Sequence, residues 1–267
     1  MNNEDNNIYE TGGIKLAESI SDIKSKYNNL KDGEFEDFIA AYSQDDRRGV
    51  IQLVNKATGV IEKHKAEIER TERMLSYEKQ YSSYCYICGI DEVGRGPLAG
   101  PVVAGAVILP KDEKILYLND SKQLSAGKRD ELYDIIYEKA VAVSIGMVDH
   151  RRIDEINILQ ATYEAMRQAI MNLAVQPDIL LNDAVTIPQV DIPQVPIIKG
   201  DAKSCSIAAA SIVAKVTRDR IMEEMDSVYP GYGFAGNKGY GSAEHIRAIR
   251  ELGPCPIHRR SFIGNFV

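Results

Sequence analysis

Hydrophobic and polar residues alternate with a helical period over the first third of the chain and give way to short apolar runs beyond residue 84. The spacing predicts helices over 14–27 and 35–42, and a long one from a cap at Asp45–Asp46 toward residue 79. Apolar positions of the long helix follow a four-three rhythm, typical of a helix packed in its own small bundle, with an intermolecular coiled coil as the alternative. Residues 1–84 are therefore predicted to form an all-helical N-terminal domain.

From residue 85 onward, apolar segments alternate with amphipathic ones. Strands are predicted over 85–91, 102–109, 141–148, 179–181 and 195–198, and helices over 126–139, 156–173 and 204–229. A last helix begins at the cap Ser242 and ends at Gly253–Pro254. This order indicates an α/β fold, a sheet flanked by helices with a site along one edge of the strands. Residues 85–267 are predicted to be the catalytic domain, with a helical, substrate-binding C-terminal segment from about 230 to 267.

Size and composition fit one good-sized core plus an accessory domain. The chain has 267 residues, of which 44% are hydrophobic and 27% charged. Its N-terminus has no positive start followed by an apolar stretch, as a secretory signal would. The longest apolar run, 97–110, is broken by Gly and Pro and is too short to span a bilayer. A cytoplasmic protein without membrane association is expected.

Charge is unevenly distributed along the chain. The net charge of −7 argues against a protein that coats nucleic acid through a broad basic surface. The segment 236–267 is locally basic, because Lys238, Arg247, Arg250, Arg259 and Arg260 outnumber Glu244 and Glu251. Residues 1–84 carry more acidic than basic side chains. That balance favours a protein contact or a passive scaffold for this extension over an arm that grips nucleic acid.

The four cysteines give no metal or disulfide signature. Cys85 and Cys88 lie three apart in a predicted strand, so they point to opposite faces and suit neither a shared zinc nor a disulfide. No second close pair follows. All four, including Cys205 and Cys255, are expected to be reduced and chemically silent.

Four acids are candidates for catalysis because each lies where an apolar segment surfaces. They are Asp91, Glu92, Asp183 and Asp201. Clustered carboxylates repel one another unless a cation compensates, and hard oxygen ligands suit Mg²⁺, with Mn²⁺ as a substitute. Two such ions could activate a water and stabilise the leaving 3′ oxygen of a phosphodiester. In a regular strand Asp91 and Glu92 would face opposite ways, so Glu92 must use the strand end or a distortion near Gly94.

The residues Gly94, Arg95 and Gly96 predict either a plain tight turn or a substrate contact. Glycines let backbone groups approach a sugar closely, and the 2′-hydroxyl is the group that separates RNA from DNA. The spacing is neither the dinucleotide fingerprint nor a P-loop. Lys203 and Ser204 precede a predicted helix, where they could bind a phosphate, with a plain helix cap as the alternative for Ser204.

Six motifs in order resemble ribonuclease HII over residues 86–262. They are GIDEVGRGPLAGP at 89–101, DSKQLS at 120–125, INILQAT at 156–162, KGD at 199–201 with AAASIVAKVTRD at 208–219, NKGY at 237–240 and PIHRRSF at 256–262. The resemblance implies a ribonuclease H-like mixed sheet and a helical N-terminal extension of the kind some bacterial members carry. The sequence departs from the family pattern at Asn182 and Ala184, where an apolar residue and a glycine are usual.

The resemblance implies a metal-dependent endonuclease that cuts RNA in RNA–DNA hybrids and 5′ of single ribonucleotides in duplex DNA. Asp91, Glu92, Asp183 and Asp201 match the metal-binding acids, and Gly94, Arg95 and Gly96 the ribonucleotide-sensing turn. Tyr240 matches the tyrosine that stacks on the next deoxyribose, and Lys122 a phosphate contact. The expected roles are ribonucleotide removal and RNA primer removal by a monomer.

Three questions stay open at this point. The competing readings are a hybrid-binding protein whose acids hold ions structurally, and activity on long hybrids only, as in ribonuclease HIII. His258 could either pack in the interior or contact a phosphate. Residues 1–84 could hold a protein partner, grip the hybrid or act as a scaffold.

Overall fold

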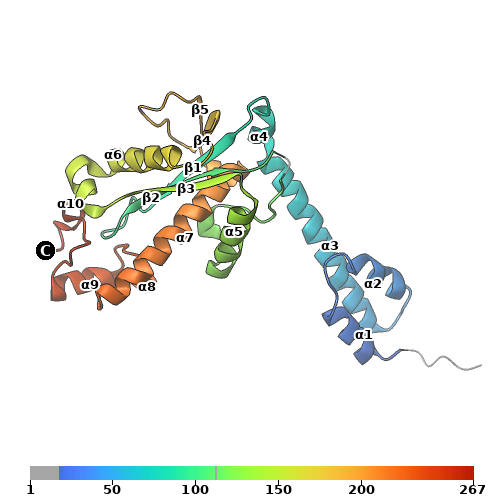
Figure 1. The fold of residues 1–267 in the computed structure, drawn as a ribbon. Coiled ribbons are helices and arrows are strands. Elements are labelled where there is room, and N and C mark those ends of the chain that lie inside the picture. The colour runs from blue at the N-terminus through green and yellow to red at the C-terminus, as the bar shows by residue number, and fades with distance from the viewer. Residues whose placement is uncertain (1–17, 112) are drawn as a thin grey trace, which may run out of the picture. The chain divides into compact units, whose positions relative to one another are not determined.

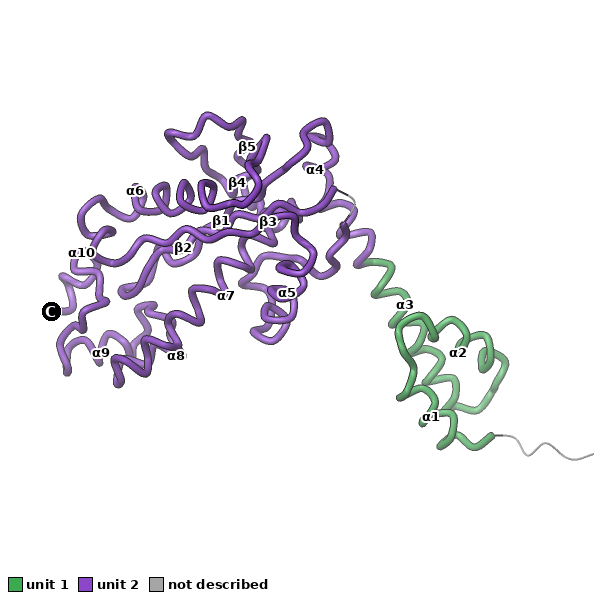
Figure 2. Tube along the Cα trace, viewed as in Figure 1, with its two compact units in different colours: residues 1–66 green, residues 67–267 purple. Residues whose placement is uncertain are grey.

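The computed structural model describes residues 18–111 and 113–267. The chain divides into two compact units, residues 1–66 and 67–267 (Figure 2). Helix α3, Arg48–Met74, contributes to both. The domain boundary predicted after residue 84 stays a prediction, because compactness alone does not define a domain.

The first unit contains α1 (Ile20–Asn28), α2 (Phe35–Tyr42) and the beginning of α3. Ser19 starts α1, since its hydroxyl accepts a hydrogen bond from the Asp22 amide at 3.1 Å. The buried core is formed by Ile23, Phe38, Val50, Leu53 and Ala57. The predicted first helix is present as α1 from Ile20 onward, and its predicted positions 14–17 lie outside the described residues.

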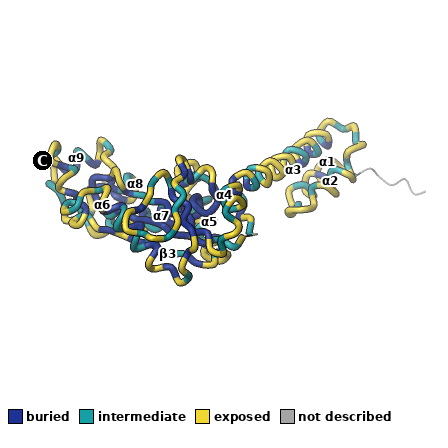
Figure 3. The backbone as a smooth tube through the Cα atoms, turned by 90° about the horizontal axis from the view of Figure 1, so that it is seen from above, coloured by how far each residue is buried: buried dark blue, intermediate teal, exposed yellow. Residues whose placement is uncertain are grey.

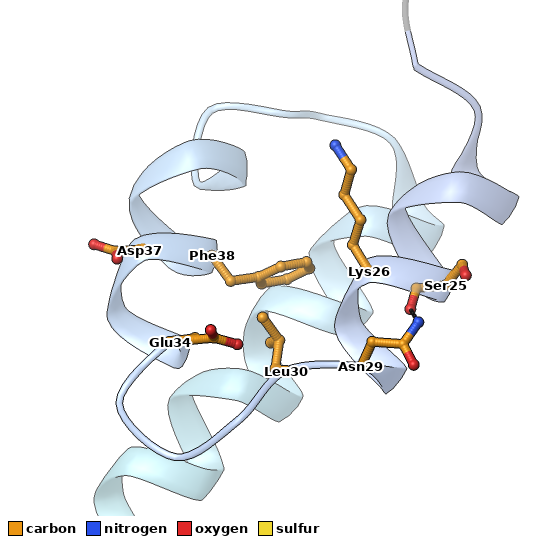
Figure 4. A pocket seen from close by; sticks show the side chains of 7 residues that line it. All are labelled: Ser25, Lys26, Asn29, Leu30, Glu34, Asp37 and Phe38. Atoms are coloured by element: carbon orange, nitrogen blue, oxygen red, sulfur yellow. Dashed lines mark hydrogen bonds between the residues drawn. The ribbon is translucent and has the colours of Figure 1, made fainter.

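A hollow of about 490 Å³ opens between α1 and α2 of this unit (Figure 4). Its floor includes Leu30 and the buried ring of Phe38, and its rim includes Lys26, Glu34 and Asp37. Acids and a base on one rim beside an apolar floor are ordinary for a small helical bundle. We assign no chemistry to this hollow.

The predicted continuous helix up to residue 79 is interrupted. Helix α3 ends at Met74, and a short helix α4 follows over Ser76–Gln80. Met74 and Leu75 are both buried in one apolar cluster with residues of the second unit. Beyond this break, Glu78 of α4 accepts a hydrogen bond of 2.6 Å from the Ser204 hydroxyl.

The second unit is built on a five-stranded mixed sheet, as predicted (Figure 1). Its strands are β1 (Ile87–Val93), β2 (Val102–Ile108), β3 (Ala142–Val148), β4 (Ile179–Asp183) and β5 (Gln194–Ile197). Their order is β3-β2-β1-β4-β5. The first three pair antiparallel, whereas β4 runs parallel to β1 and β5 parallel to β4. The carboxyl ends of β1 and β4 therefore meet at one edge.

Helices cover both faces of this sheet (Figure 1). On one face α6 (His150–Met171) packs with Val102, Ala104 and Ala106 of β2. On the other, α5 (Ala126–Lys139) and α7 (Cys205–Val228) pack with Val107. Alternate residues of a strand face opposite sides, so the all-apolar β2 serves both cores. Buried positions gather along α7 and the strands beside it (Figure 3).

The expected helix over 156–173 is the second part of α6. Asn157 leaves the helical conformation with φ 67° and ψ 164°, and its side-chain oxygen accepts from the Leu159 and Gln160 amides at 3.0 and 3.1 Å. Asn157 thus acts as an N-cap inside α6. The preceding turn, which the apolar spacing did not predict, is capped by Asp149.

Two central glycines let α7 approach the sheet at backbone distance. A Cβ on Gly89 would lie 2.0 Å from the Ser206 carbonyl carbon, and one on Gly105 would lie 2.5 Å from the Ala210 oxygen. Small residues on α7, including Ala208 and Ala209, complete this contact. Any side chain at either glycine would therefore push the helix off the sheet.

The C-terminal segment is helical, as predicted, and packs on the far end of α7. It contains α8 (Phe234–Asn237), α9 (Ala243–Leu252) and α10 (Arg260–Ile263). Ser242 caps α9, since its hydroxyl accepts from the His245 amide at 3.2 Å. Leu98, Met222 and Phe234 share a buried cluster there. Across the described ranges, no helix combines the length and apolarity needed to cross a membrane.

The glycine contact can be tested by its effect on stability. Gly89→Ala should lower the free energy of unfolding by about 3 kcal/mol, because the new methyl group meets backbone that cannot move alone. Gly127→Ala, at a helical glycine with nothing within 4 Å of its Cβ position, is the matched control and should raise it by about 0.5 kcal/mol. Urea unfolding followed by circular dichroism measures both. Equal, small changes would contradict the close approach.

Candidate active site

The four predicted acids come from adjoining elements at one edge of the sheet. Asp91 and Glu92 lie in β1, Asp183 ends β4, and Asp201 lies in a 3₁₀ turn, Gly200–Ala202. Ile90 pairs with Asn182, so Asp91 and Asp183 follow paired residues of parallel strands. The Asp183 carboxylate accepts a hydrogen bond of 2.7 Å from the Gly200 amide, which ties β4 to the turn that carries Asp201.

The pKa of Asp91 lies well above its usual range. Burial is the main cause, since only 6% of Asp91 is exposed, and the charges of Glu92 and Asp183 add to it. The Glu92 amide donates to the Asp91 carboxylate at 2.7 Å, and the Ser211 hydroxyl opposes the shift. Asp91 is thus a carboxyl group whose ionised form lacks compensating charge.

Glu92 has the same difficulty. Burial raises its pKa and the charge of Asp183 adds to the shift, while Arg95 opposes it. Arg95 donates to one Glu92 carboxylate oxygen at 3.3 Å. The other oxygen is buried and has no hydrogen-bond partner. The charge of Asp183 therefore acts on both adjacent strand residues.

Asp201 completes the group of acids and brings a fifth carboxylate near it. Burial raises the pKa of Asp201, and the charges of Asp120 and Asp183 contribute, while Lys122 opposes them. Asp120 was not expected at the site, although it lies in the DSKQLS motif. Its position two residues before Lys122 is the signal that could have indicated it.

The acids fit a divalent cation by their chemistry. Raised pKa values on three hard carboxyl groups and an unpaired buried oxygen on Glu92 are what an added positive charge would relieve. In the ranges 18–111 and 113–267, no three His, Cys, Asp or Glu side chains converge closely enough to hold an ion as they stand. The residues present therefore match the oxygen ligands that a divalent cation prefers, and in the described ranges their side chains lie further apart than in a closed metal site.

The glycine turn, residues 94–96, lies beside Tyr240. Gly94 has φ 93°, in the region that favours glycine, and a Cβ there would lie 2.4 Å from the Arg218 Nε atom. A Cβ on Gly96 would lie 3.8 Å from the Cε1 atom of the Tyr240 ring. Tyr240 is 41% exposed. Two sets of residues distant in sequence thus meet on one accessible surface.

The two lysines and the serine that were predicted to bind phosphate differ in their exposure to solvent. Lys122 and Lys203 are exposed. Ser204 is fully buried, and its hydroxyl donates to Glu78 at 2.6 Å and accepts from the Ile207 amide at 3.2 Å. Ser204 therefore caps α7, the alternative named above, and the Glu78 carboxylate occupies the position of an anion at this helix end. A phosphate contact by Ser204 stays an untested prediction.

The departures at Asn182 and Ala184 have local structural consequences. Ala184 has φ 54°, a conformation that glycine adopts without strain. Asn182 is fully buried, and its amide donates to the Gln194 side chain at 2.8 Å. The amide nitrogen of this polar residue thus has a side-chain partner on β5, whereas its Oδ1 atom is buried without one, and Asp183 keeps its place at the strand end.

His258 packs in the interior. It is 1% exposed, and its Nε2 atom lies 3.0 Å from the His245 Nε2 atom. Burial lowers the pKa of His258 to about 4, so the ring is neutral near pH 7. All four cysteines are free; Cys85 is exposed and the other three are buried.

Comparison with known proteins gives the family. A model of ribonuclease HII matches residues 88–265, and a model of the ribonuclease HII N-terminal domain matches residues 19–82. Ribonuclease HII of Lachnoclostridium phytofermentans is 65% identical over 246 residues, covering 92% of this chain and 97% of that protein. Ribonuclease HII of Clostridioides difficile is 50% identical over 251 residues, covering 93% and 98%.

Solved structures agree with these relatives. Ribonuclease H2 from Pyrococcus horikoshii superposes with a TM-score of 0.56 at 29% identity, covering 66% of this chain and 93% of that one. The Archaeoglobus fulgidus ribonuclease HII, solved in a complex with PCNA, gives 0.58 at 26%, covering 67% and 96%. With family models over both parts and relatives along most of its length, this chain belongs to the ribonuclease HII family, endonucleases of the ribonuclease H type.

Proposed function

We propose that this endonuclease cuts RNA in RNA–DNA hybrids and nicks duplex DNA on the 5′ side of a single embedded ribonucleotide. The products are a 3′-hydroxyl and a 5′-phosphate. The observation that carries the proposal is the continuity of β1 with the glycine turn, which leads from the acids Asp91 and Glu92 to Gly96 beside Tyr240. A cutting site and a sugar-reading site are then separated by a few residues. Ribonucleotide removal and RNA primer removal are the cellular roles that suit this activity.

The acids Asp91, Glu92, Asp183 and Asp201 hold the metal, either Mg²⁺ or Mn²⁺, with two ions in the active complex. When bound, the metal supplies Lewis acidity for water attack and for departure of the 3′ oxygen. A hydrogen bond from the Gly200 amide orients the Asp183 carboxylate, and a hydrogen bond from Arg95 orients the Glu92 carboxylate. We assign the phosphate contact to Lys122, and its exposure and its charge near Asp201 support this role.

The sugar is read by the glycine turn and Tyr240. Backbone amides of the turn sense the 2′-hydroxyl, and the exposed ring stacks on the deoxyribose that follows the ribonucleotide. Lys203 adds an exposed positive charge after the Asp201 turn. Residues 1–84, with their acidic balance, serve as a scaffold or hold a protein partner, and the chain acts as a cytoplasmic monomer.

The decisive assay uses a DNA duplex with one embedded ribonucleotide and a matched RNA–DNA hybrid, each with Mg²⁺, Mn²⁺ or EDTA. We expect one metal-dependent nick, 5′ of the ribonucleotide. Cutting of the long hybrid alone would replace the proposal by activity of the ribonuclease HIII kind. Tight binding with no cut in either substrate would leave only the hybrid-binding alternative.

Asp91→Asn should separate activity from stability. Cleavage should fall by about a thousandfold or more, because the metal loses a carboxylate ligand. The melting temperature in EDTA should not fall, since the substitution removes a buried charge that repels Glu92 and Asp183. Asp130→Asn, at an exposed carboxylate on α5 paired with Arg220, is the control and should cut normally. A variant that is active, or inactive only because it unfolds, contradicts the assignment.

Tyr240→Ala should affect the two substrates unequally. Loss of a stacking ring is worth about 1 to 3 kcal/mol, so kcat/KM on the single ribonucleotide should drop roughly 5- to 150-fold. The drop on a continuous hybrid should be several times smaller, because many registers remain available there. Tyr240→Phe keeps the ring and should stay near the wild type. Equal losses on both substrates would remove the junction role.

A further inference from the structure

Two fully buried arginines lie behind the glycine turn, and the roles proposed so far use neither of them. Arg218 belongs to α7 and Arg259 precedes α10, and both have 0% exposure. In the described part of the chain, neither guanidinium forms an ion pair with a carboxylate. Buried arginines are ordinarily paired, because an unpaired buried charge costs several kcal/mol. Two buried guanidiniums without carboxylate partners are therefore unusual, and their hydrogen bonds indicate what they do.

The two guanidiniums donate all their hydrogen bonds to backbone carbonyl oxygens. Arg259 donates to Gly94 at 2.6 Å, Arg95 at 3.0 Å and Gly100 at 2.9 Å. Arg218 donates to Ala99 at 3.1 Å, Pro101 at 2.9 Å and Lys238 at 2.9 Å. Five of the six acceptors lie in residues 94–101, and the sixth lies two residues before Tyr240. The loop is therefore held from inside through its carbonyl groups.

Holding these carbonyl groups fixes the direction of the amides that follow them. In a trans peptide the C=O and N–H bonds point to opposite sides, and no peptide bond of the described residues is cis. Since Arg259 binds the Gly94 and Arg95 oxygens, the Arg95 and Gly96 amides point away from it. Neither amide has a protein acceptor in the described ranges, whereas the Leu98 and Gly100 amides donate to Gly239 and Ile257.

Charge adds to this geometry. Burial lowers the pKa of Arg259 to about 9, with the charge of Arg218 contributing, and also lowers the pKa of Arg218. A guanidinium keeps its proton at neutral pH in proteins, so two positive charges stand behind the outward amides. A sugar-phosphate backbone that approaches the turn from outside meets free donors with a favourable field behind them.

We propose that Arg259, supported by Arg218, is a positioning residue for ribonucleotide selection: it sets the two peptide planes of the glycine turn so that the Arg95 and Gly96 amides face the substrate sugar and its phosphate. The inference rests on the proposed function. Gly94 is needed for the same reason, because any Cβ there would collide with Arg218. Arg218 also approaches Tyr240, with its guanidinium carbon 5.9 Å from the ring centroid, so it links the turn to the stacking residue.

The test measures affinity for a duplex with one ribonucleotide and for the same all-DNA duplex, both with Ca²⁺ in place of Mg²⁺. The readout is the dissociation constant for the all-DNA duplex divided by that for the ribonucleotide duplex. This ratio is independent of the fraction of active protein. Arg259→Lys keeps the charge but replaces the planar fork of donors, spread over Nε, Nη1 and Nη2, by one compact ammonium that does not match the spacing of the three carbonyls. The ratio should fall about tenfold, the value of one hydrogen bond, while all-DNA affinity changes little. Arg220→Lys, at an exposed arginine of α7 that pairs with Asp130, should leave the ratio unchanged.

A merely structural role predicts a different result. Arg259→Lys would then lower the melting temperature and leave the ratio at its wild-type value, which would overturn the proposal. A wild-type ratio near one, with no nick 5′ of the ribonucleotide in Mg²⁺, would instead overturn the proposed function on which the inference rests.

A measurement on the unmodified protein covers the case in which the variant fails to fold. Amide resonances of Arg95 and Gly96 should shift when the ribonucleotide duplex is added with Ca²⁺, and should shift less with the all-DNA duplex. The Leu98 and Gly100 amides, already hydrogen-bonded inside the protein, are the internal controls. Equal shifts at all four amides, or none at Arg95 and Gly96, would contradict the proposal.

Discussion

The contact between the α7 backbone and the glycines of the central strands governs the rest of the second unit. Gly89 and Gly105 allow a helix to lie on the sheet with no side-chain layer between them. One helix then serves three parts of the site: it starts just after Asp201, carries Ser211 beside Asp91, and brings Arg218 to the glycine turn. A layer of ordinary side chains would displace all three together.

The site is also a place where charges are held against their preference. On one side, buried acids repel one another, and on the other two guanidiniums are buried without carboxylates. Groups of this kind cost stability unless something else compensates them. The acids precede the glycine turn in β1 and the guanidiniums bind carbonyl oxygens in residues 94–101, so charges of both signs adjoin this turn. The surrounding apolar clusters supply the stability that these charges remove.

The sequence predicted the sheet and its main helices because their apolar periods are regular, as in the all-apolar β2. It did not predict the left-handed backbone at Asn157 and Ala184, because such conformations arise where tertiary contacts outweigh local preference. The ends of β1 and β4 could be predicted to carry acids, since each apolar run stops at one. How near the acids lie depends on strand order, which periodicity does not give.

The buried arginines show the same limit from another side. In the sequence Arg259 adds to a basic segment and is indistinguishable from the exposed Arg260 next to it. Arg218 did carry a signal, because it follows Ala214 and Ser211 by one and two helical turns and so shares their buried face. The roles of the acids, turn and tyrosine in substrate binding remain predictions for the assays to judge.

The two packed histidines have a consequence for the direction of hydrogen bonding. The Tyr240 carbonyl lies 2.8 Å from His245 Nδ1, which must therefore carry the proton of a neutral ring. His245 Nε2 is then an acceptor, so His258 donates from Nε2 and accepts from the Cys255 amide at Nδ1, 3.0 Å away. The hydrogen bonds form one series in which every donor points the same way, from the Cys255 amide to the Tyr240 carbonyl. A second proton on His258 Nδ1 would remove the acceptor of the Cys255 amide, and one on His245 Nε2 would set two donors against each other, so the series of hydrogen bonds is complete only while both rings are neutral.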